Sequence, residues 1–136
     1  MLFRSLAAID RRLSAVEALV GDTVGREELI LALTGIGDME RLVGRIVYGT
    51  GGGRDLAALR AAAEKIPAVK AQLARFPDRR LSELLDGLDD LADVAGLIAQ
   101  SIADDPPFSV REAGFIRDGY NAEVDRLREK IGRAHV

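Results

Sequence analysis

The sequence predicts an all-α fold, an irregular helical bundle that is interrupted by one short extended turn segment near residues 108–120. Apolar residues recur at steps of three and four through most of the 136 residues, which is the spacing of one buried helix face. Glycine and proline separate these periods at short intervals, and strand-like character is confined to residues 110–116. We therefore expect one domain of short helices joined by local connections.

Three helices are expected in the first part of the chain. The first covers residues 9–20 and ends at Gly21, because glycine readily adopts the left-handed conformation that closes a helix. The second covers residues 27–33 and carries acidic residues in its first turn, where the helix dipole favours them. Asp38 is expected to cap a third helix over residues 39–47, which has an apolar side and a charged side.

Three further helices are expected after the flexible glycine loop at residues 49–53. A fourth helix passes through residues 56–63 and a fifth through residues 69–76, each with apolar residues on one face. Ser82 is expected to cap a sixth helix, because an apolar stripe of helical period is continuous over residues 82–102. This sixth helix is the longest that the pattern predicts.

The stretch over residues 104–121 is the least interchangeable part of the sequence, since neither a helix nor a simple hairpin explains it. The pair Pro106–Pro107 fixes φ, removes two N–H donors and so stops the preceding helix. Gly114 and Gly119 then allow sharp reversals of the backbone. Asn121 is expected to cap a last helix, whose apolar positions follow helical spacing. These positions are Val124, Leu127 and Ile131.

Four aromatic residues are expected to anchor helix ends in the core, because aromatic side chains bury a large area at a low entropic cost. They are Phe76, Phe108, Phe115 and Tyr120. A platform for stacking nucleic-acid bases would instead place such residues on a basic surface. The formal net charge of -3 argues against an autonomous nucleic-acid binder, so any role on DNA is expected to be indirect.

Composition excludes several kinds of chemistry. Cysteine is absent, which removes disulfides, thiolate metal sites and sulfur redox chemistry, and which fits a reducing cytoplasm. No apolar run approaches the ~20 residues that span a bilayer. No nucleophile–base pair can be assembled, because the only histidine is His135 at the C-terminal end. We therefore expect no catalytic, metal-binding or cofactor-binding residue in this segment, and no enzymatic activity of its own.

Two features suggest a ligand site, and each has a simpler interpretation. The glycine loop at residues 49–53 could cradle a phosphate, but the Lys and Ser/Thr of a P-loop are absent and a helix precedes the loop, which favours a plain connector. The pairs Asp89–Asp90 and Asp104–Asp105 could bind a metal or act as acid and base. Neighbouring residues on a helix point in different directions, which favours solvated helix faces and ends.

Three blocks of the sequence carry a family resemblance. Residues 9–20 form a block of modest specificity. Residues 35–46 and 54–59 combine Glu-Arg-Leu-x-Gly-Arg with a later Arg-Asp-Leu, and residues 104–128 form the most specific block. The residues singled out are Glu40, Arg41, Gly44, Arg45, Arg54, Asp55, Leu56, Asp105, Pro106, Pro107, Arg111, Gly114, Ile116, Gly119, Tyr120 and Asn121. With these blocks the chain resembles the MutS family of DNA mismatch-repair proteins, although Ala113 stands where that family typically has a second glycine.

The resemblance implies a helical core of the MutS type, the core or lever domain, over residues 1–130 and incomplete at both ends. Such a core connects the ATPase of the full-length protein to its DNA clamp and mismatch-binding parts without catalysis of its own. The resemblance also implies ATP and Mg for the full-length protein, mismatched double-stranded DNA as its target, a homodimer and a MutL-type partner. It implies a bacterial, cytoplasmic protein that associates with the nucleoid.

Two alternatives remain open at this point. The chain could instead be a free-standing helical module that binds a partner helix in an exposed groove. Residues 131–136 can be back-translated as ATC GGA AGA GCA CAC GTC, which matches the start of a common sequencing-adapter read. We expect these residues to be an artefact, with a natural tail as the alternative, and they carry no weight in the fold prediction.

Overall fold

The computed structural model describes residues 5–109 and 111–133 of the chain. These residues fall into two compact units. Unit 1 combines Met1–Ile36 with Ala63–Asp90, and unit 2 combines Gly37–Ala62 with Leu91–Val136. The chain therefore passes between the units three times, and each unit is built from two separate stretches of sequence.

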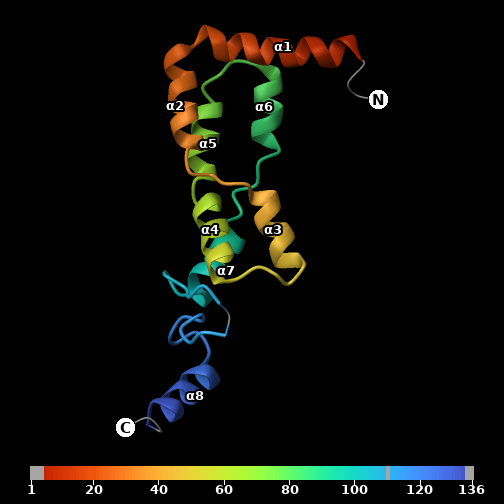
Figure 1. The fold of residues 1–136 in the computed structure, drawn as a ribbon. Helices are drawn as coiled ribbons and strands as arrows, with labels where there is room; N and C mark the ends of the chain where they lie inside the picture. The colour runs from red at the N-terminus through yellow and green to blue at the C-terminus, as the bar shows by residue number, and fades with distance from the viewer. Residues whose placement is uncertain (1–4, 110, 134–136) are drawn as a thin grey trace. The chain divides into compact units, whose positions relative to one another are not determined.

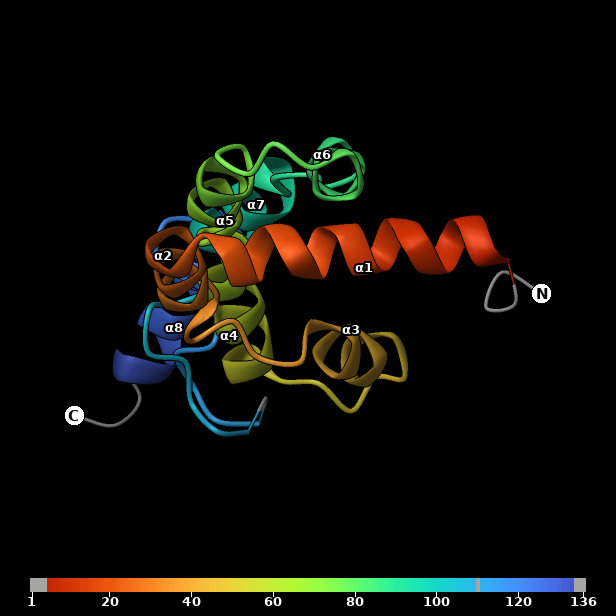
Figure 2. The same cartoon turned by 90° about the horizontal axis from the view of Figure 1, so that it is seen from above.

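Unit 1 contains four helices, which Figure 1 shows in red to green. They are α1 (Leu6–Gly21), α2 (Thr23–Leu33), α5 (Ile66–Leu73) and α6 (Arg79–Asp86). Helix α2 packs along α5, and α1 contacts both α2 and α6 (Figures 1 and 2). The helix expected over residues 9–20 is confirmed with an earlier start, but the left-handed cap expected at Gly21 is wrong, because Gly21 is the last helical residue and has no positive φ. The helix expected over residues 27–33 begins one turn sooner because Asp22 caps it.

One apolar cluster holds the four helices of unit 1 together. It draws side chains from α1, α2, α5 and α6 and from the turn between α5 and α6. Phe76 in that turn is 5% exposed, so its ring is buried in the cluster. The buried members are Ala15, Leu29, Val69, Leu73, Phe76 and Leu81.

Asp78 caps α6 and is the buried carboxylate of this unit. Its Oδ1 accepts a hydrogen bond from the backbone N–H of Leu81 at 3.0 Å, and its Oδ2 accepts one from the hydroxyl of Ser14 in α1 at 2.7 Å. These bonds stabilise the charged form, and they hold the pKa of Asp78 below its ordinary value, with the Ser14 bond as the largest cause. The expected Ser82 cap is wrong, because Asp78 starts the helix four residues earlier.

The single long helix expected over residues 82–102 is also wrong. Helix α6 ends at Asp86, and α7 (Ala92–Ser101) begins after Leu91, which has a left-handed backbone with φ of 52°. The apolar stripe is continuous in sequence but serves two different cores. Leu85 and Leu88 pack against the cluster of unit 1, whereas Ile98 packs in the cluster of unit 2, and the chain passes from one unit to the other after Asp90.

Unit 2 contains α3 (Met39–Val47), α7 and α8 (Ala122–Arg133). It also contains α4 (Gly53–Ala63) except for the last residue of that helix, Ala63, which belongs to unit 1. Asp38 caps α3, as its position predicts, by accepting a hydrogen bond from the backbone N–H of Arg41 at 2.9 Å. The buried cluster of this unit combines Leu42, Leu59, Ile98 and Ile102. Met39, Ile46, Leu56, Phe115 and Ile116 pack against it.

The extended turn segment expected near residues 108–120 is confirmed in a minimal form. Its pairing is one isolated antiparallel bridge between Ile102 and Ile116. The backbone N–H of Ala103 donates to the carbonyl of Phe115 at 3.2 Å, and the N–H of Arg117 donates to the carbonyl of Ser101 at 2.9 Å. The two glycines of the segment, Gly114 and Gly119, have φ of 94° and 83°, which confirms the backbone reversals. Val110 lies outside the described residues.

The aromatic residues divide evenly between confirmed and wrong predictions. Phe76 is buried in unit 1, and Phe115 packs against the cluster of unit 2. Phe108 is 80% exposed and Tyr120 is 47% exposed, so neither anchors a helix end. The ring of Phe108 lies under the guanidinium of Arg54, 5.7 Å from it, which is a surface cation–π contact rather than core packing.

Within residues 5–109 and 111–133, no helix has the length and apolar character needed to cross a membrane.

Candidate functional site at the glycine loop and the Pro-Pro segment

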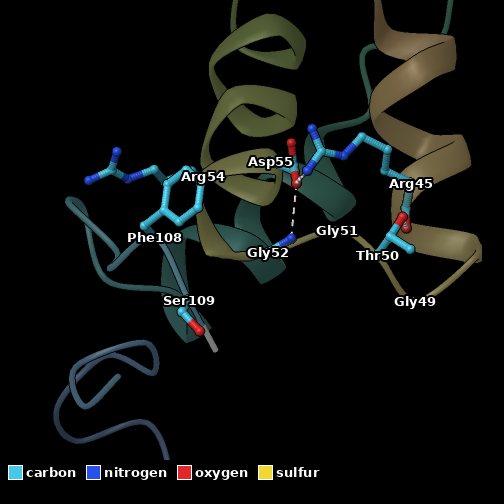
Figure 3. A pocket seen from close by; sticks show the side chains of 9 residues that line it. All are labelled: Arg45, Gly49, Thr50, Gly51, Gly52, Arg54, Asp55, Phe108 and Ser109. Carbon is cyan, nitrogen blue, oxygen red and sulfur yellow. Dashed lines mark hydrogen bonds and ion pairs between the residues drawn. The ribbon is translucent and has the colours of Figure 1, made fainter. Parts of the chain in front are cut away.

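The glycine loop after α3 is a closed, hydrogen-bonded turn. The carbonyl of Arg45 accepts from the backbone N–H groups of Thr50 and Gly51, at 2.9 and 2.8 Å. Asp55 then joins the loop to α4, because its Oδ2 accepts from the N–H of Gly52 at 2.9 Å and lies 3.2 Å from Nη2 of Arg45. Figure 3 shows these two contacts meeting on the Asp55 carboxylate. One carboxylate therefore fixes the end of α3 to the start of α4.

The start of α4 packs against the Pro-Pro segment, which lies some fifty residues later in the chain. The Nε of Arg54 donates to the carbonyl of Pro106 at 3.3 Å, and its guanidinium lies over Phe108 (Figure 3). Gly53 allows this approach, since a Cβ built on it would lie 2.6 Å from Cβ of Pro106 and 2.9 Å from the ring of Phe115. A residue with a side chain would push the two segments apart.

These contacts surround an open hollow of about 400 Å³. Its lining offers two guanidinium groups, the amides of the glycine loop and one exposed aromatic ring (Figure 3). Asp55 already neutralises one guanidinium, and a backbone carbonyl holds the other. The arrangement is therefore a structural junction, and its lining contains no nucleophile–base pair. The lining residues are Arg45, Gly49, Thr50, Gly51, Gly52, Arg54, Asp55, Phe108 and Ser109.

A charged network ties the same helix α4 to the segment after α7. Arg117 donates to Asp104 from both terminal guanidinium nitrogens, from Nη2 to Oδ1 at 2.6 Å and from Nη1 to Oδ2 at 3.2 Å, and Arg60 of α4 reaches Oδ1 at 3.3 Å. The hydrogen bonds from Arg117, and then those from Arg60, hold the pKa of Asp104 below its ordinary value. The same Asp104 contact raises the pKa of Arg117. The fork geometry of Arg117 gives the network a defined orientation.

The base of α8 is fixed to the same segment. Asn121 caps the helix as predicted, since its Oδ1 accepts from the N–H groups of Glu123 and Val124 at 3.0 and 3.2 Å. The guanidinium of Arg128 reaches back to the carbonyl of Ile116 at 2.8 Å and to the carboxylate of Asp118 at 2.6 Å. The junction therefore continues from α3 through α4 and the Pro-Pro segment to α8, all within unit 2.

Comparison with known proteins decides the family. The family model described as MutS domain III matches residues 3–136. The chain belongs to the MutS domain III family. It is 44% identical over 119 residues to the DNA mismatch repair protein MutS of Brevibacillus brevis, and 43% identical over 121 residues to that of Halothermothrix orenii. It is 39% identical over 136 residues to the protein of the same name in Methanothrix thermoacetophila.

These matches cover 88%, 89% and 97% of this chain but only 14%, 14% and 16% of the respective relatives. The chain therefore spans about a seventh of the length of the curated relatives it matches. The resemblance to the MutS family and the all-α class are both confirmed. Domain III is the part of the family that the chain represents.

The residues singled out from the MutS resemblance fall into two groups in space. Arg45, Arg54 and Asp55 lie at the glycine loop, where Pro106 accepts a hydrogen bond from Arg54, and Leu56 packs against the core of unit 2. The base of α8 brings together Ile116, Gly119 and Asn121. The structure draws the remaining residues into neither group. They are Glu40, Arg41, Gly44, Asp105, Pro107, Arg111, Gly114 and Tyr120, of which all but Gly44 and Pro107 are exposed.

Sequence reasoning on the domain III pattern missed several residues that carry contacts of the junction. Among them are Gly53, Arg60, Asp104, Arg117 and Arg128. Gly53 had a visible signal, since a third successive glycine immediately before a helix indicates a close approach of another segment. The pairing of Asp104 with Arg117 had none, because the twelve residues between them follow an irregular path that reverses at Gly114, and no spacing rule describes such a path.

Proposed function

We propose that this chain is the domain III core of a DNA mismatch-repair ATPase and acts there as a scaffold and relay, without catalysis of its own. The observation that carries the proposal is the continuous junction of unit 2. It links α3, α4, the Pro-Pro segment and the base of α8 by named polar contacts. The family match and the names of the relatives support the mismatch-repair context.

The junction suits a relay because it joins rigid elements at few points. Helices are stiff, so a small rotation at the base of α8 becomes a larger displacement at its far end. A relay further requires two arrangements of the bundle that two ligands prefer to different extents. In the proposed full-length protein those ligands are ATP with Mg and mismatched double-stranded DNA. A homodimer, a MutL-type partner and action at chromosomal DNA belong to the same proposal.

The test uses the whole polypeptide encoded by the reading frame that contains this segment. Its affinity for a duplex with one mismatch is compared with that for the matched duplex, with and without ATP. We expect preferential binding of the mismatched duplex and a change of that preference on adding ATP. Equal affinity for the two duplexes under both conditions would rule the proposal out.

Two variants make the test specific to the junction. Arg54→Gln removes the contact with Pro106 and the cation–π contact, and we expect it to weaken the effect of ATP on DNA binding. Arg79→Gln is the matched control, because the Arg79 side chain is exposed in unit 1 and pairs within its own helix with Glu83. An equal effect of both variants would count against the junction as the relay.

One observation favours the alternative, a helical interaction module. Helix α1 exposes an apolar stripe at steps of three and four residues, a pattern that binds a partner helix. The stripe consists of Leu6, Ile9, Leu13, Val16 and Val20. Long-read sequencing of the source DNA across both ends of the reading frame separates the two functions. Continuation into clamp helices and a P-loop supports the repair ATPase, and a stop after residue 136 supports the module.

A further inference from the structure

Helix α8 differs from the other helices of unit 2 in what holds it. Leu127 is 47% exposed and Ile131 is 62% exposed, and Val124 is half-buried. The buried cluster of the unit and the described side chains packed against it come from α3, α4, α7 and the segment after α7, and none comes from α8. Apolar packing orients most helices in proteins. In the described part of this unit it does not orient α8.

Polar contacts take its place. Arg128 donates from Nη2 to the carbonyl of Ile116 at 2.8 Å and from Nη1 to Oδ1 of Asp118 at 2.6 Å. Asp125 accepts from the backbone N–H of Gly119 at 3.0 Å. Both side chains are half-buried against the turn, and they lie one helical turn apart on the same face of α8.

The turn that receives these contacts is fixed to the rest of the unit on its other side. Ile116 bridges Ile102, and the N–H of Arg117 donates to Ser101 at the end of α7. The guanidinium of Arg117 reaches Asp104, which also contacts Arg60 of α4. Arg128 therefore connects α8 to a segment that is already attached to both α4 and α7.

Gly119 lies between the two sides of this contact. Its φ of 83° places it in the left-handed region, where glycine moves with little steric restriction. Ile116 and Asp118 precede it, and Arg128 follows it, so the Arg128 contacts close a loop across this left-handed glycine. Without these contacts, the connection keeps only the hydrogen bonds that the N–H groups of Gly119 and Tyr120 donate to Asp125 and to the carbonyl of Arg117.

We propose that Arg128 is a positioning residue: it latches α8 to the turn at residues 116–119 and so sets the direction in which the helix leaves unit 2. The latch is releasable, because Asp118 is 94% exposed and an exposed ion pair is weak and screened by salt. The latch itself is a property of this chain alone, whereas its use as the pivot of the relay rests on the function proposed above. Opening the latch would change the direction of α8 without unfolding the unit.

The experiment measures the direction of α8 by distances between spin labels in the 136-residue chain. The sequence contains no cysteine, so Ala58→Cys in α4 and Lys130→Cys in α8 take labels at two exposed sites only. We expect one narrow distance distribution in the parent. Arg128→Gln should broaden it at least twofold, and Arg128→Lys should give an intermediate width, since a lysine keeps the charge but cannot reach both oxygens with a planar fork. High salt should also broaden the distance distribution of the parent chain, because it screens the ion pair between Arg128 and Asp118.

Arg126→Gln is the matched control. Arg126 stands two residues earlier on α8 and pairs with Glu123 of the same helix at 2.6 Å, so its loss removes an ion pair without touching the turn. We expect its distribution to match that of the parent. A second label pair, Ala58→Cys with Leu97→Cys, joins α4 to α7 and should not change in any variant.

Three results would overturn the latch. They are a broad distribution in the parent, equal distributions for Arg128→Gln and Arg126→Gln, and a change in the second label pair, which would make Arg128 necessary for the fold of the unit. The measurement contains neither DNA nor ATP. A negative result therefore removes the latch alone, whereas loss of mismatch preference in the whole polypeptide removes the proposed function and leaves the latch standing.

Discussion

The two units of the chain are held together by different kinds of contact. Unit 1 packs four helices around one apolar cluster, and its buried carboxylate, Asp78, is satisfied by a cap and a hydroxyl. Unit 2 has a smaller buried cluster, and its irregular segments are joined to its helices by guanidinium groups that reach backbone carbonyls and carboxylates. The helices of unit 1 thus pack directly on one another, whereas the irregular segments of unit 2 are held by polar contacts.

The largest expected effect tests the packing of unit 1. Phe76→Ala should destabilise the chain by about 3–5 kcal/mol, because it removes a buried ring and leaves a cavity. Phe108→Ala should cost less than about 0.5 kcal/mol, since that ring is exposed in unit 2. Urea denaturation of both variants measures the contrast. Equal losses of stability would show that the two rings have the same role and would break the comparison.

Periodicity alone predicted most of unit 1 and the helical parts of unit 2. The caps at Asp38 and Asn121 and the left-handed Gly114 and Gly119 were also visible, because each follows from the chemistry of one residue type. Such features depend on neighbours in the sequence. They can therefore be read without knowing the fold.

The features that could not be predicted depend on which core a residue joins. The stripe over residues 82–102 has one period but serves two clusters, so the break at Leu91 has no counterpart in the pattern. The exposure of Phe108 likewise has no counterpart in the pattern, since the contact of its ring is with Arg54, which lies more than fifty residues earlier in the sequence. The contacts of Asp104 and Arg128 likewise depend on the path of the chain between two glycines.

The next effect tests the close approach in unit 2. Gly53→Ala should destabilise the chain by about 1–3 kcal/mol, because its Cβ would lie 2.6 Å from a proline ring that cannot rotate away. Gly96→Ala is the control in the same unit, since that position lies inside α7 with open space around it. It should stabilise the chain by about 0.5–1 kcal/mol through helix propensity. Thermal unfolding compares the two, and a shift in the same direction for both would contradict the packing argument.

A substitution in the turn before α8 should destabilise the chain by a similar or smaller amount. Gly119→Val is expected to cost about 1–3 kcal/mol, because a β-branched residue is strained at positive φ. Gly37→Val is the control, since Gly37 has open space and no positive φ. Equilibrium denaturation measures both variants. Unchanged stability for Gly119→Val would mean that the turn relaxes and that the latch has no fixed support.

A smaller and local effect is expected for the cap of α8. Asn121→Ala should destabilise this helix by about 1 kcal/mol, since it leaves the N–H groups of Glu123 and Val124 without a partner. Because the described core cluster includes no residue of α8, the loss should appear as faster hydrogen exchange in α8, roughly five- to tenfold, without a change in global stability. A drop in the protection of α4 and α7 would show that α8 is part of the cooperative core after all.

The smallest expected effect compares how the two units resist acid. Asp78 and Asp104 both have a lowered pKa in the folded chain, so each contributes stability that is fully present above the ordinary carboxyl value of 3.8 and is lost as the pH falls through the lowered value. In unit 1 the largest cause is the neutral hydroxyl of Ser14, so salt should leave the pKa of Asp78 nearly unchanged, and Ser14→Ala should raise it. In unit 2 the largest cause is the charged Arg117 at an exposed site, so salt and Arg117→Gln should both raise the pKa of Asp104. Carboxyl NMR titration at low and high salt measures the two groups separately. Equal shifts of the two pKa values with salt would show that the same kind of contact holds both carboxylates. Such a result would contradict the contrast between the hydroxyl contact of Asp78 and the charged contact of Asp104.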